Sequence, residues 1–349
     1  MKKDFGITKN GEAVSAYTIS NSSGMSATIT SYGATLVSLN VPDKDGGTRD
    51  IVLGYDDVKG YEANGTYFGA IIGRNSNRIC EGKVTLDGVT YQMEQNDNEN
   101  NLHSGAAGVD KKVWTVLSED DSAVSFICKS NDMEQGLPGN VTITVNYRIT
   151  EANELVITYD AVSDKKTIIN LTNHSYFNLN GHDGGSIEGH ELQLFADCYN
   201  PVIDAKSIPT EENAPVDGTV FDFRTPKKIG TDIEAEEQQL KFVGGYDHNY
   251  VINGKSGNMR PFAKVYSEDS GILMEFSSDQ TGTQLYTGNF IGDQKGKDGA
   301  EYNKRSGFCL EPQYIPNAMN FVPEGSIDSP VFDADERYHS ESCFKFSVI

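Results

Sequence analysis

The feature that most constrains the fold of this chain is the repeated alternation of short strand-forming runs with polar turns, with almost no helical period. The clearest cases are "KVTLDGVTYQM" (83–93), "VWTVLSEDDSAVSFICKS" (113–130), "VTITVNYRITEANELVITYDAV" (141–162) and "FAKVYSEDSGILMEFSS" (262–278). In each case β-branched and aromatic residues lie on both sides of a turn built from Gly, Asp, Ser, Glu or Asn. This pattern predicts antiparallel hairpins.

Helical signals are weak by comparison. The best helix candidate is the short acidic stretch "GTDIEAEEQQLKF" (230–242). The chain contains no fixed-period repeat and no Pro/Gly/Ser-rich linker that would mark a domain boundary. Its 349 residues are enough for one large all-β domain. We therefore predict an all-β protein, a large antiparallel β-sandwich that forms a single domain over residues 1–349.

The net charge of the chain argues against some classes of binding partner. The 29 Lys and Arg residues face 51 Asp and Glu residues, which gives a formal net charge of −22. This charge repels phosphate backbones and anionic lipids, so neither nucleic acid nor a membrane surface is expected as a partner. No stretch approaches the roughly 18 apolar residues that a membrane-spanning helix requires.

The five cysteines (Cys80, Cys128, Cys198, Cys309 and Cys343) are scattered, without the short paired spacing of metal or redox sites. We expect them to be reduced and mostly buried, which favours a cytoplasmic location. A leader peptide that had already been removed would leave the same sequence, so secretion stays open.

An unusual glutamate lies in "GFCLEPQYIPNAMN" (307–320). Glu311 follows three apolar residues, and Pro312 comes next. Because strand interiors disfavour Glu and Pro cannot donate a ladder hydrogen bond, we expect Glu311 where the chain leaves a sheet, with Pro312 ending the pairing. Such a carboxylate either faces a cleft or protects an edge strand against aggregation.

Four further polar stretches interrupt the strand pattern: "GRNSNRI" (73–79), "NLHSG" (101–105), "LTNHSYFNLNG" (171–181) and "GGYDHNYVI" (244–252). Each has an ordinary explanation when taken alone, since arginines are common at surfaces, lone histidines are common in cores and Asp is common near glycine turns. No His pair has metal-ligand spacing, so no metal site is expected. No Gly-x-Ser-x-Gly turn suggests a serine nucleophile. Two acidic residues, Asp247 and Glu311, could also serve a glycosidase.

Together and in this order, the five stretches resemble the aldose 1-epimerase family, also called galactose mutarotases. "GRNSNRI" is similar to the family pattern Gly-Arg-x-x-Asn-Arg-Ile, "NLHSG" to Asn-x-Leu-His-Gly-Gly and "CLEPQ" to Cys-Leu-Glu-x-Gln, and "TNHSYFNL" is essentially verbatim. The resemblance covers nearly the whole chain. It implies the galactose mutarotase-like supersandwich, a free aldohexose as the substrate in an open cleft, and no cofactor.

The resemblance also implies roles for individual residues. Glu311 corresponds to the general base and His174 to the general acid, and His103 belongs to the same catalytic set. The residues expected to hold the sugar are Arg74, Asn75, Asp247 and Gln284. An ionised Glu and a protonated His begin in opposite states, as ring opening of a hexose requires.

Four residues depart from the family pattern, namely Pro312, Asn317, Ser104 and Glu211. None of them is a proton carrier in the expected mechanism. Two alternatives stay open beside a hexose mutarotase. One is a hexose-6-phosphate 1-epimerase, which would need extra basic residues near C6 of the sugar, and the other is a carbohydrate-binding module without turnover.

Overall fold

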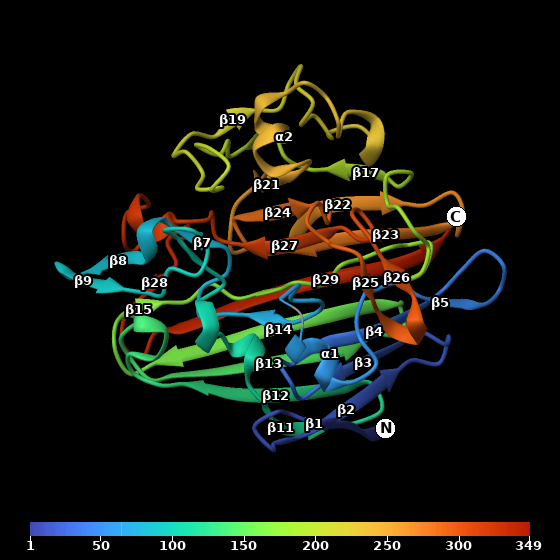
Figure 1. Cartoon of the computed structure of the whole chain (residues 1–349), viewed down its shortest axis with the longest axis horizontal. Helices are drawn as coiled ribbons and strands as arrows, with labels where there is room; N and C mark the ends of the chain where they lie inside the picture. Colours follow the sequence, from blue (N-terminus) through green and yellow to red (C-terminus); the bar gives the residue numbers. More distant parts are fainter. Residues whose placement is uncertain (64) are drawn as a thin grey trace.

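The computed structural model describes residues 1–63 and 65–349. Its largest sheet contains nine antiparallel strands, with the carboxyl-terminal strand near the middle. Figure 1 shows this last strand, β29, with β12–β14 on one side and β21, β24 and β27 on the other. In spatial order the nine strands are β11 (Thr115–Glu119), β12 (Ala123–Ser130), β13 (Val141–Ile149), β14 (Glu154–Ser163), β29 (Arg337–Val348), β23 (Ile272–Ser278), β22 (Arg260–Tyr266), β17 (Glu191–Leu194) and β20 (Lys227–Lys228).

Two further antiparallel sheets have five strands each. The amino-terminal sheet runs in chain order through β1 (Lys2–Ile7), β2 (Ala13–Ser20), β3 (Ser26–Thr30), β4 (Leu36–Pro42) and β5 (Thr48–Asp50). The other, which we call the site sheet, has the order β19 (Ala214–Pro215), β18 (Cys198–Tyr199), β21 (Asp247–Val251), β24 (Gly282–Tyr286) and β27 (Cys309–Gln313).

Short pairs and turns of helix complete the structure. The two-stranded pairs are β6 (Ile71–Ile72) with β16 (Thr172–Asn173), β7 (Arg78–Ile79) with β10 (Asn101–Leu102), β8 (Lys83–Leu86) with β9 (Val89–Gln92), β15 (Thr167–Ile168) with β28 (Val331–Phe332), and β25 (Gln294–Lys295) with β26 (Glu301–Tyr302). The α-helices are α1 (Val58–Ala63) and α2 (Gln238–Val243). Single 3₁₀ turns are η1 (Cys80–Gly82), η2 (Gly105–Ala107), η3 (Val109–Lys111), η4 (Glu134–Gly136), η5 (Ile229–Thr231), η6 (Lys297–Gly299) and η7 (Ala318–Asn320).

The predicted all-β architecture is confirmed, and so are the four predicted hairpins, which are β8–β9, β11–β12, β13–β14 and β22–β23. The predicted helix over 230–242 is mostly wrong. Glu237 caps α2 by accepting a hydrogen bond from the backbone N–H of Gln239, and Gly244 ends the helix at a φ of 72°. Since both helix ends are fixed in this way, only six residues are helical.

Pro312 does not end the pairing of its strand, so that part of the prediction is wrong. β27 continues to Gln313, with Pro312 opposite Thr283 and Glu311 opposite Gln284. β27 is the last strand of the site sheet. An edge strand tolerates proline because one row of its N–H groups has no partner strand, and Glu311 therefore lies inside a strand.

The core follows the two-residue period of the strands. In β13 every second side chain is buried, namely Val141, Ile143, Val145, Tyr147 and Ile149. All five cysteines are free. Within the described residues, no helix has the length and apolar character needed to cross a membrane.

Candidate active site

Three neighbouring strands of the site sheet point polar side chains to one face. Gln284 on β24 lies opposite Asn249 on β21 and opposite Glu311 on β27. Because side chains alternate along a strand, Asp247 two residues before Asn249 points to the same side. The opposite face of these strands carries buried residues such as Tyr250, Leu285 and Leu310. The sheet thus has one apolar face toward the core and one polar face.

A pocket of about 200 Å³ lies over the polar face. It is open to the surface, and the rest of its wall comes from residues 65–67, from β7 and β10 with their neighbouring residues, and from the segments that follow β16 and β24. It is lined by Gly65, Thr66, Tyr67, Asn77, Arg78, Leu102, His103, His174, Tyr176, Asp247, Gln284, Tyr286, Phe290, Ile291 and Glu311.

The pocket brings Glu311 and His174 together. His174 Nε2 lies 3.7 Å from Glu311 Oε2, and the two side chains are only 6% and 3% exposed. Glu311 Oε2 has no hydrogen-bond partner among the described residues. A buried carboxylate oxygen without a partner is costly, so a ligand that donates a hydrogen bond to it would be bound favourably.

Burial shifts the protonation of both groups toward neutrality. Burial, reinforced by the nearby Asp247 carboxylate, raises the pKa of Glu311 well above its usual range. Burial also lowers the pKa of His174 to about 4. Both shifts favour a neutral carboxyl group beside a neutral imidazole, an arrangement that places one proton on Glu311. The ion pair of an ionised Glu311 and a protonated His174 contains the same number of protons and differs only in where the proton lies.

His103 presents one defined nitrogen to the pocket. Its Nδ1 accepts a hydrogen bond of 3.1 Å from the backbone N–H of Asn77. Burial, followed by the nearby His174, lowers the pKa of His103 well below its usual value, so the ring is neutral. A neutral imidazole that accepts at Nδ1 carries its hydrogen on Nε2. His103 is therefore a hydrogen-bond donor at Nε2.

The tautomer of His103, with its hydrogen on Nε2, also disfavours metal binding. Ligand atoms of His103, His174 and Glu311 all lie within 4.8 Å of one another, and two histidines with a carboxylate can form a catalytic zinc site. A ligating nitrogen needs a free lone pair, which Nε2–H of His103 lacks while Nδ1 holds the Asn77 N–H. The cluster as arranged thus fits hydrogen bonding to a substrate better than metal coordination.

A chain of amide side chains holds the floor of the pocket. Gln284 Nε2 donates to Asp247 Oδ1 at 2.7 Å, and Gln313 Nε2 donates to both Gln284 Oε1 and Asn249 Oδ1 at 3.3 Å. Burial raises the pKa of Asp247, and the Arg78 guanidinium opposes that shift. The network fixes the orientation of Asp247 and Gln284 before any ligand arrives.

The structure does not bring Arg74 and Asn75 to this pocket, although both were predicted to hold the sugar. Arg74 is fully buried. Its guanidinium donates to Ser130 Oγ, Thr167 Oγ1 and the carbonyl oxygens of Asn131, Leu137 and Pro138. Asn75 Nδ2 donates to the carbonyls of Ser76 and Asn77, and its backbone N–H is bound by Ser104 Oγ. The sugar-holding assignment therefore needs other residues.

Arg78 and Asn77, from the same stretch, line the pocket instead. The Arg78 guanidinium is paired with Asp97 Oδ2 at 2.7 Å, and its side chain is 15% exposed. The pattern "GRNSNRI" contains two arginines four residues apart, and the irregular backbone that separates them has no period that would tell which one faces the site. Four aromatic lining residues (Tyr67, Tyr176, Tyr286 and Phe290) were also not predicted. Tyr176 lies in the stretch that contains His174, and Tyr286 and Phe290 lie in "QLYTGNF" (284–290), which also resembles a family segment, whereas Tyr67 lies in neither stretch.

Comparisons with known proteins agree with this geometry. Residues 15–344 match the family model of aldose 1-epimerase. The chain belongs to the aldose 1-epimerase family. It is 43% identical to bovine galactose mutarotase over 323 residues, which cover 92% of this chain and 90% of the relative. It is 35% identical to aldose 1-epimerase of Escherichia coli over 340 residues, with 97% of both chains covered.

Solved structures lead to the same conclusion. An aldose epimerase homologue from C. elegans superimposes with a TM-score of 0.88 at 32% identity, covering 97% of this chain and all of that one. Galactose 1-epimerase from Lactobacillus acidophilus gives a TM-score of 0.86 at 27% identity, covering 100% and 98%. The predicted family, its supersandwich fold and its reaction class, an isomerase of aldoses, are confirmed.

Proposed function

We propose that this aldose 1-epimerase interconverts the α and β anomers of a free aldohexose, with Glu311 and His174 as the proton carriers. The single observation that carries the proposal is the approach of His174 Nε2 to Glu311 Oε2 at 3.7 Å in a pocket of about 200 Å³. This places one acid and one base on the same small cavity. Ring opening needs no more than one of each.

The chemistry follows from the shared proton. Glu311 takes the proton of the C1 hydroxyl, the bond from C1 to the ring oxygen breaks, and the ring oxygen takes a proton from His174. The product is an open-chain aldehyde. After rotation about C1–C2, the C5 hydroxyl attacks the other face of the carbonyl and returns its proton to His174, while Glu311 returns a proton to the carbonyl oxygen.

Burial of the two proton carriers assists this cycle at the open-chain intermediate. While the sugar is open, Glu311 is protonated and His174 is neutral. Burial favours that same pair of states, since it raises the pKa of the carboxyl group and lowers the pKa of the imidazole. The pocket thus stabilises the proton carriers in the state that accompanies the open-chain intermediate.

The remaining polar groups suit a sugar. The Nε2–H of His103 and the Arg78 guanidinium are donors, and Asp247, held by Gln284, is an acceptor. We assign Arg78 and Asn77 the holding role first expected of Arg74 and Asn75. These groups supply directional hydrogen bonds to hydroxyls and to a developing charge on oxygen.

The hexose-6-phosphate alternative is less consistent with the pocket. Among the described lining residues, Arg78 is the only Arg or Lys, and Asp97 already pairs with it. Asp247 and Glu311 line the same space, where a phosphate dianion would meet two carboxyl groups. The binding-module alternative leaves the buried acid and base without a use.

The proposal is tested by polarimetry on freshly dissolved α-D-glucose and α-D-galactose. The enzyme should bring the optical rotation to equilibrium faster than buffer, with at least one sugar, and Glu311→Gln is the matched control. Glucose 6-phosphate in the same assay tests the alternative substrate. A folded protein that accelerates neither free sugar would overturn the proposal.

A further inference from the structure

Two tyrosine rings stack on the imidazole of His174. The Tyr176 ring lies 5.0 Å from it, centroid to centroid, with an angle of 16° between the planes. The Tyr67 ring lies at 5.8 Å with an angle of 19°. A third ring, Tyr286, lies farther away, at 6.4 Å, with its plane at 83° to the imidazole. The proton transfers proposed above involve none of these rings.

The orientation of an aromatic ring decides which charge it favours. Its face carries negative quadrupole potential and its edge positive potential, and a cation within about 6 Å of the centroid, over the face, is attracted. The mechanism needs His174 as an imidazolium when the cyclic sugar is bound, yet burial opposes that charge. A partner is therefore needed that stabilises a cation without forming a hydrogen bond to it.

We propose that Tyr67 and Tyr176 stabilise the imidazolium form of His174 through their ring faces and so act as positioning residues for the acid step. The catalytic benefit of this effect rests on the proposed function. The effect itself is a change in the protonation of His174, which can be measured without turnover. Tyr176 is the closer ring and is almost fully buried.

Other groups around His174 do not replace these rings. Glu311 is the one carboxyl group within 4 Å of the His174 ring nitrogens among the described residues. Cys309 Sγ lies 3.5 Å from Nδ1, and burial raises the pKa of this thiol well above its usual value, so it stays neutral. His103 meets the ring in a T-shaped contact at 5.2 Å and is neutral as well. Asp247 and Arg78, which line the same pocket, carry opposite charges.

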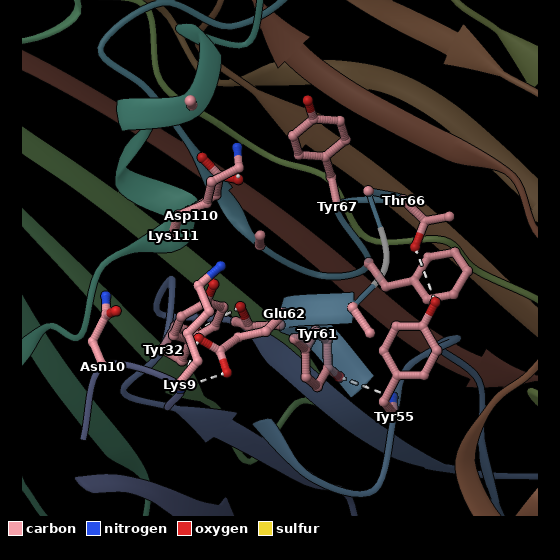
Figure 2. Close-up of a pocket in the computed structure, with 16 residues that line it drawn as sticks. Lys9, Asn10, Tyr32, Tyr55, Tyr61, Glu62, Thr66, Tyr67, Asp110 and Lys111 are labelled. Carbon is pink, nitrogen blue, oxygen red and sulfur yellow. Dashed lines mark hydrogen bonds and ion pairs between the residues drawn. The ribbon is translucent and has the colours of Figure 1, made fainter. Parts of the chain in front are cut away.

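Tyr67 also contacts residues outside the pocket around His174, and these contacts help to fix its ring. It lines both the sugar pocket and a neighbouring cavity of about 380 Å³, whose wall includes Tyr67, Asp110 and Lys111 (Figure 2). Lys111 Nζ lies 5.2 Å from the centroid of the Tyr67 ring and is itself fixed by Asp110 Oδ2 at 2.9 Å. Because one ring then serves two cations, we expect Tyr67 to contribute less to His174 than Tyr176 does.

The test is an NMR titration of the His174 imidazole in the sugar-free protein, which requires no turnover. Tyr67→Leu removes a ring face and should lower the pKa of His174 by about one unit, a value between those of an exposed and a fully desolvated cation–π contact. Tyr67→Phe keeps the ring and should titrate like the parent. Tyr286→Leu removes a ring that lies at 6.4 Å, beyond the range of about 6 Å for a cation–π contact, so it is a matched control that should produce a smaller decrease than Tyr67→Leu.

The outcomes separate this inference from the mutarotase proposal. Tyr67→Leu should also move the acidic limb of kcat/KM to lower pH, a shift that a purely structural wall residue would not cause. If Tyr67→Leu does not fold, Tyr67→Met is titrated in its place. A His174 titration that is unchanged in the folded Leu or Met variant would overturn the inference, whether or not the enzyme turns over sugar.

Discussion

Two ionisable side chains, Arg74 and Glu311, are almost completely buried in this protein, and their surroundings differ sharply. The Arg74 guanidinium donates to five oxygen atoms supplied by the segments around 130–138 and by Thr167. Glu311 has an oxygen without a partner, next to a cavity. A buried ionisable group whose hydrogen bonds are all made within the protein supports the fold, whereas one with an unpaired oxygen beside a cavity is available to a substrate.

Loss of the Glu311 carboxylate should have the largest effect on turnover. Glu311→Gln keeps the size of the side chain but cannot accept the C1 proton, so we expect kcat to fall roughly 10²- to 10⁴-fold with the fold intact. Polarimetry gives the rate, and circular dichroism confirms the fold.

His174→Asn should be comparably damaging, because it removes the other proton carrier. The double variant should lose much less than the product of the two single losses, since residues that act as a unit are not additive. If Glu311→Gln instead lowered the melting temperature and left turnover at the parental rate, Glu311 would be a stabilising edge residue and the comparison with Arg74 would fail.

Arg74→Met should lower the stability of the fold and leave the catalysed reaction unchanged. It removes the donor to the buried carbonyl oxygen of Pro138 and to the buried Ser130 Oγ, so we expect the free energy of unfolding to fall by about 2–3 kcal/mol. Denaturant unfolding measures this loss. The folded enzyme should keep kcat and KM close to the parental values.

Arg78→Met is the matched control, since it removes an arginine from the same stretch but on the pocket side. It should raise KM about tenfold, equivalent to about 1.4 kcal/mol, with a smaller loss of stability. Should Arg74→Met raise KM while Arg78→Met leaves it unchanged, the two arginines would have to exchange the roles given to them here.

The smallest expected effect is on the pH profile of kcat/KM. Both of its limbs should be displaced from the ordinary pKa values of His and Glu. Activity requires one proton on the Glu311–His174 pair. A second proton, gained as the pH falls, removes the base, and because burial lowers the pKa of His174 to about 4, this limb should lie below the ordinary histidine value of about 6.5.

The alkaline limb follows the loss of the shared proton. Burial raises the pKa of Glu311, so the pair should keep this proton to a pH above the ordinary glutamate value of about 4.3. The expected profile is a broad bell whose limbs belong to the pair. An acidic limb at 6.5 would indicate a solvated His174 and would weaken the contrast between the buried pair and ordinary surface groups.

The sequence predicted those parts of the fold that local rules decide. Turn residues between runs of β-branched and aromatic residues were enough to place β13 and β14, because the hairpin register depends on nearby residues. Pro312 was misjudged since its tolerance depends on β27 lying at the edge of a sheet. That position is a property of the assembled sheet, which no local pattern records.

The predictions for the site came from family motifs and not from local rules of strand and turn formation. Family motifs predicted roles for Glu311, His174, His103, Asp247 and Gln284; those roles stay predictions, and the five residues line one pocket. The motifs failed between Arg74 and Arg78 because the backbone between β6 and β7 has no regular period to fix side-chain direction. Tyr67 gave no signal at all, since its contact with His174 joins residues 107 positions apart (174 − 67) through packing alone.

The central position of β29 has a consequence for how the chain is completed during synthesis. β29 is the last strand of the sequence, and it pairs with β14 on one side and β23 on the other. Until residues 337–348 have left the ribosome, both of those neighbours present open edges that invite pairing with other nascent chains. A chain without residues 337–348 would therefore have its nine-stranded sheet divided, and the exposed edges of β14 and β23 would need protection by chaperones until β29 is made.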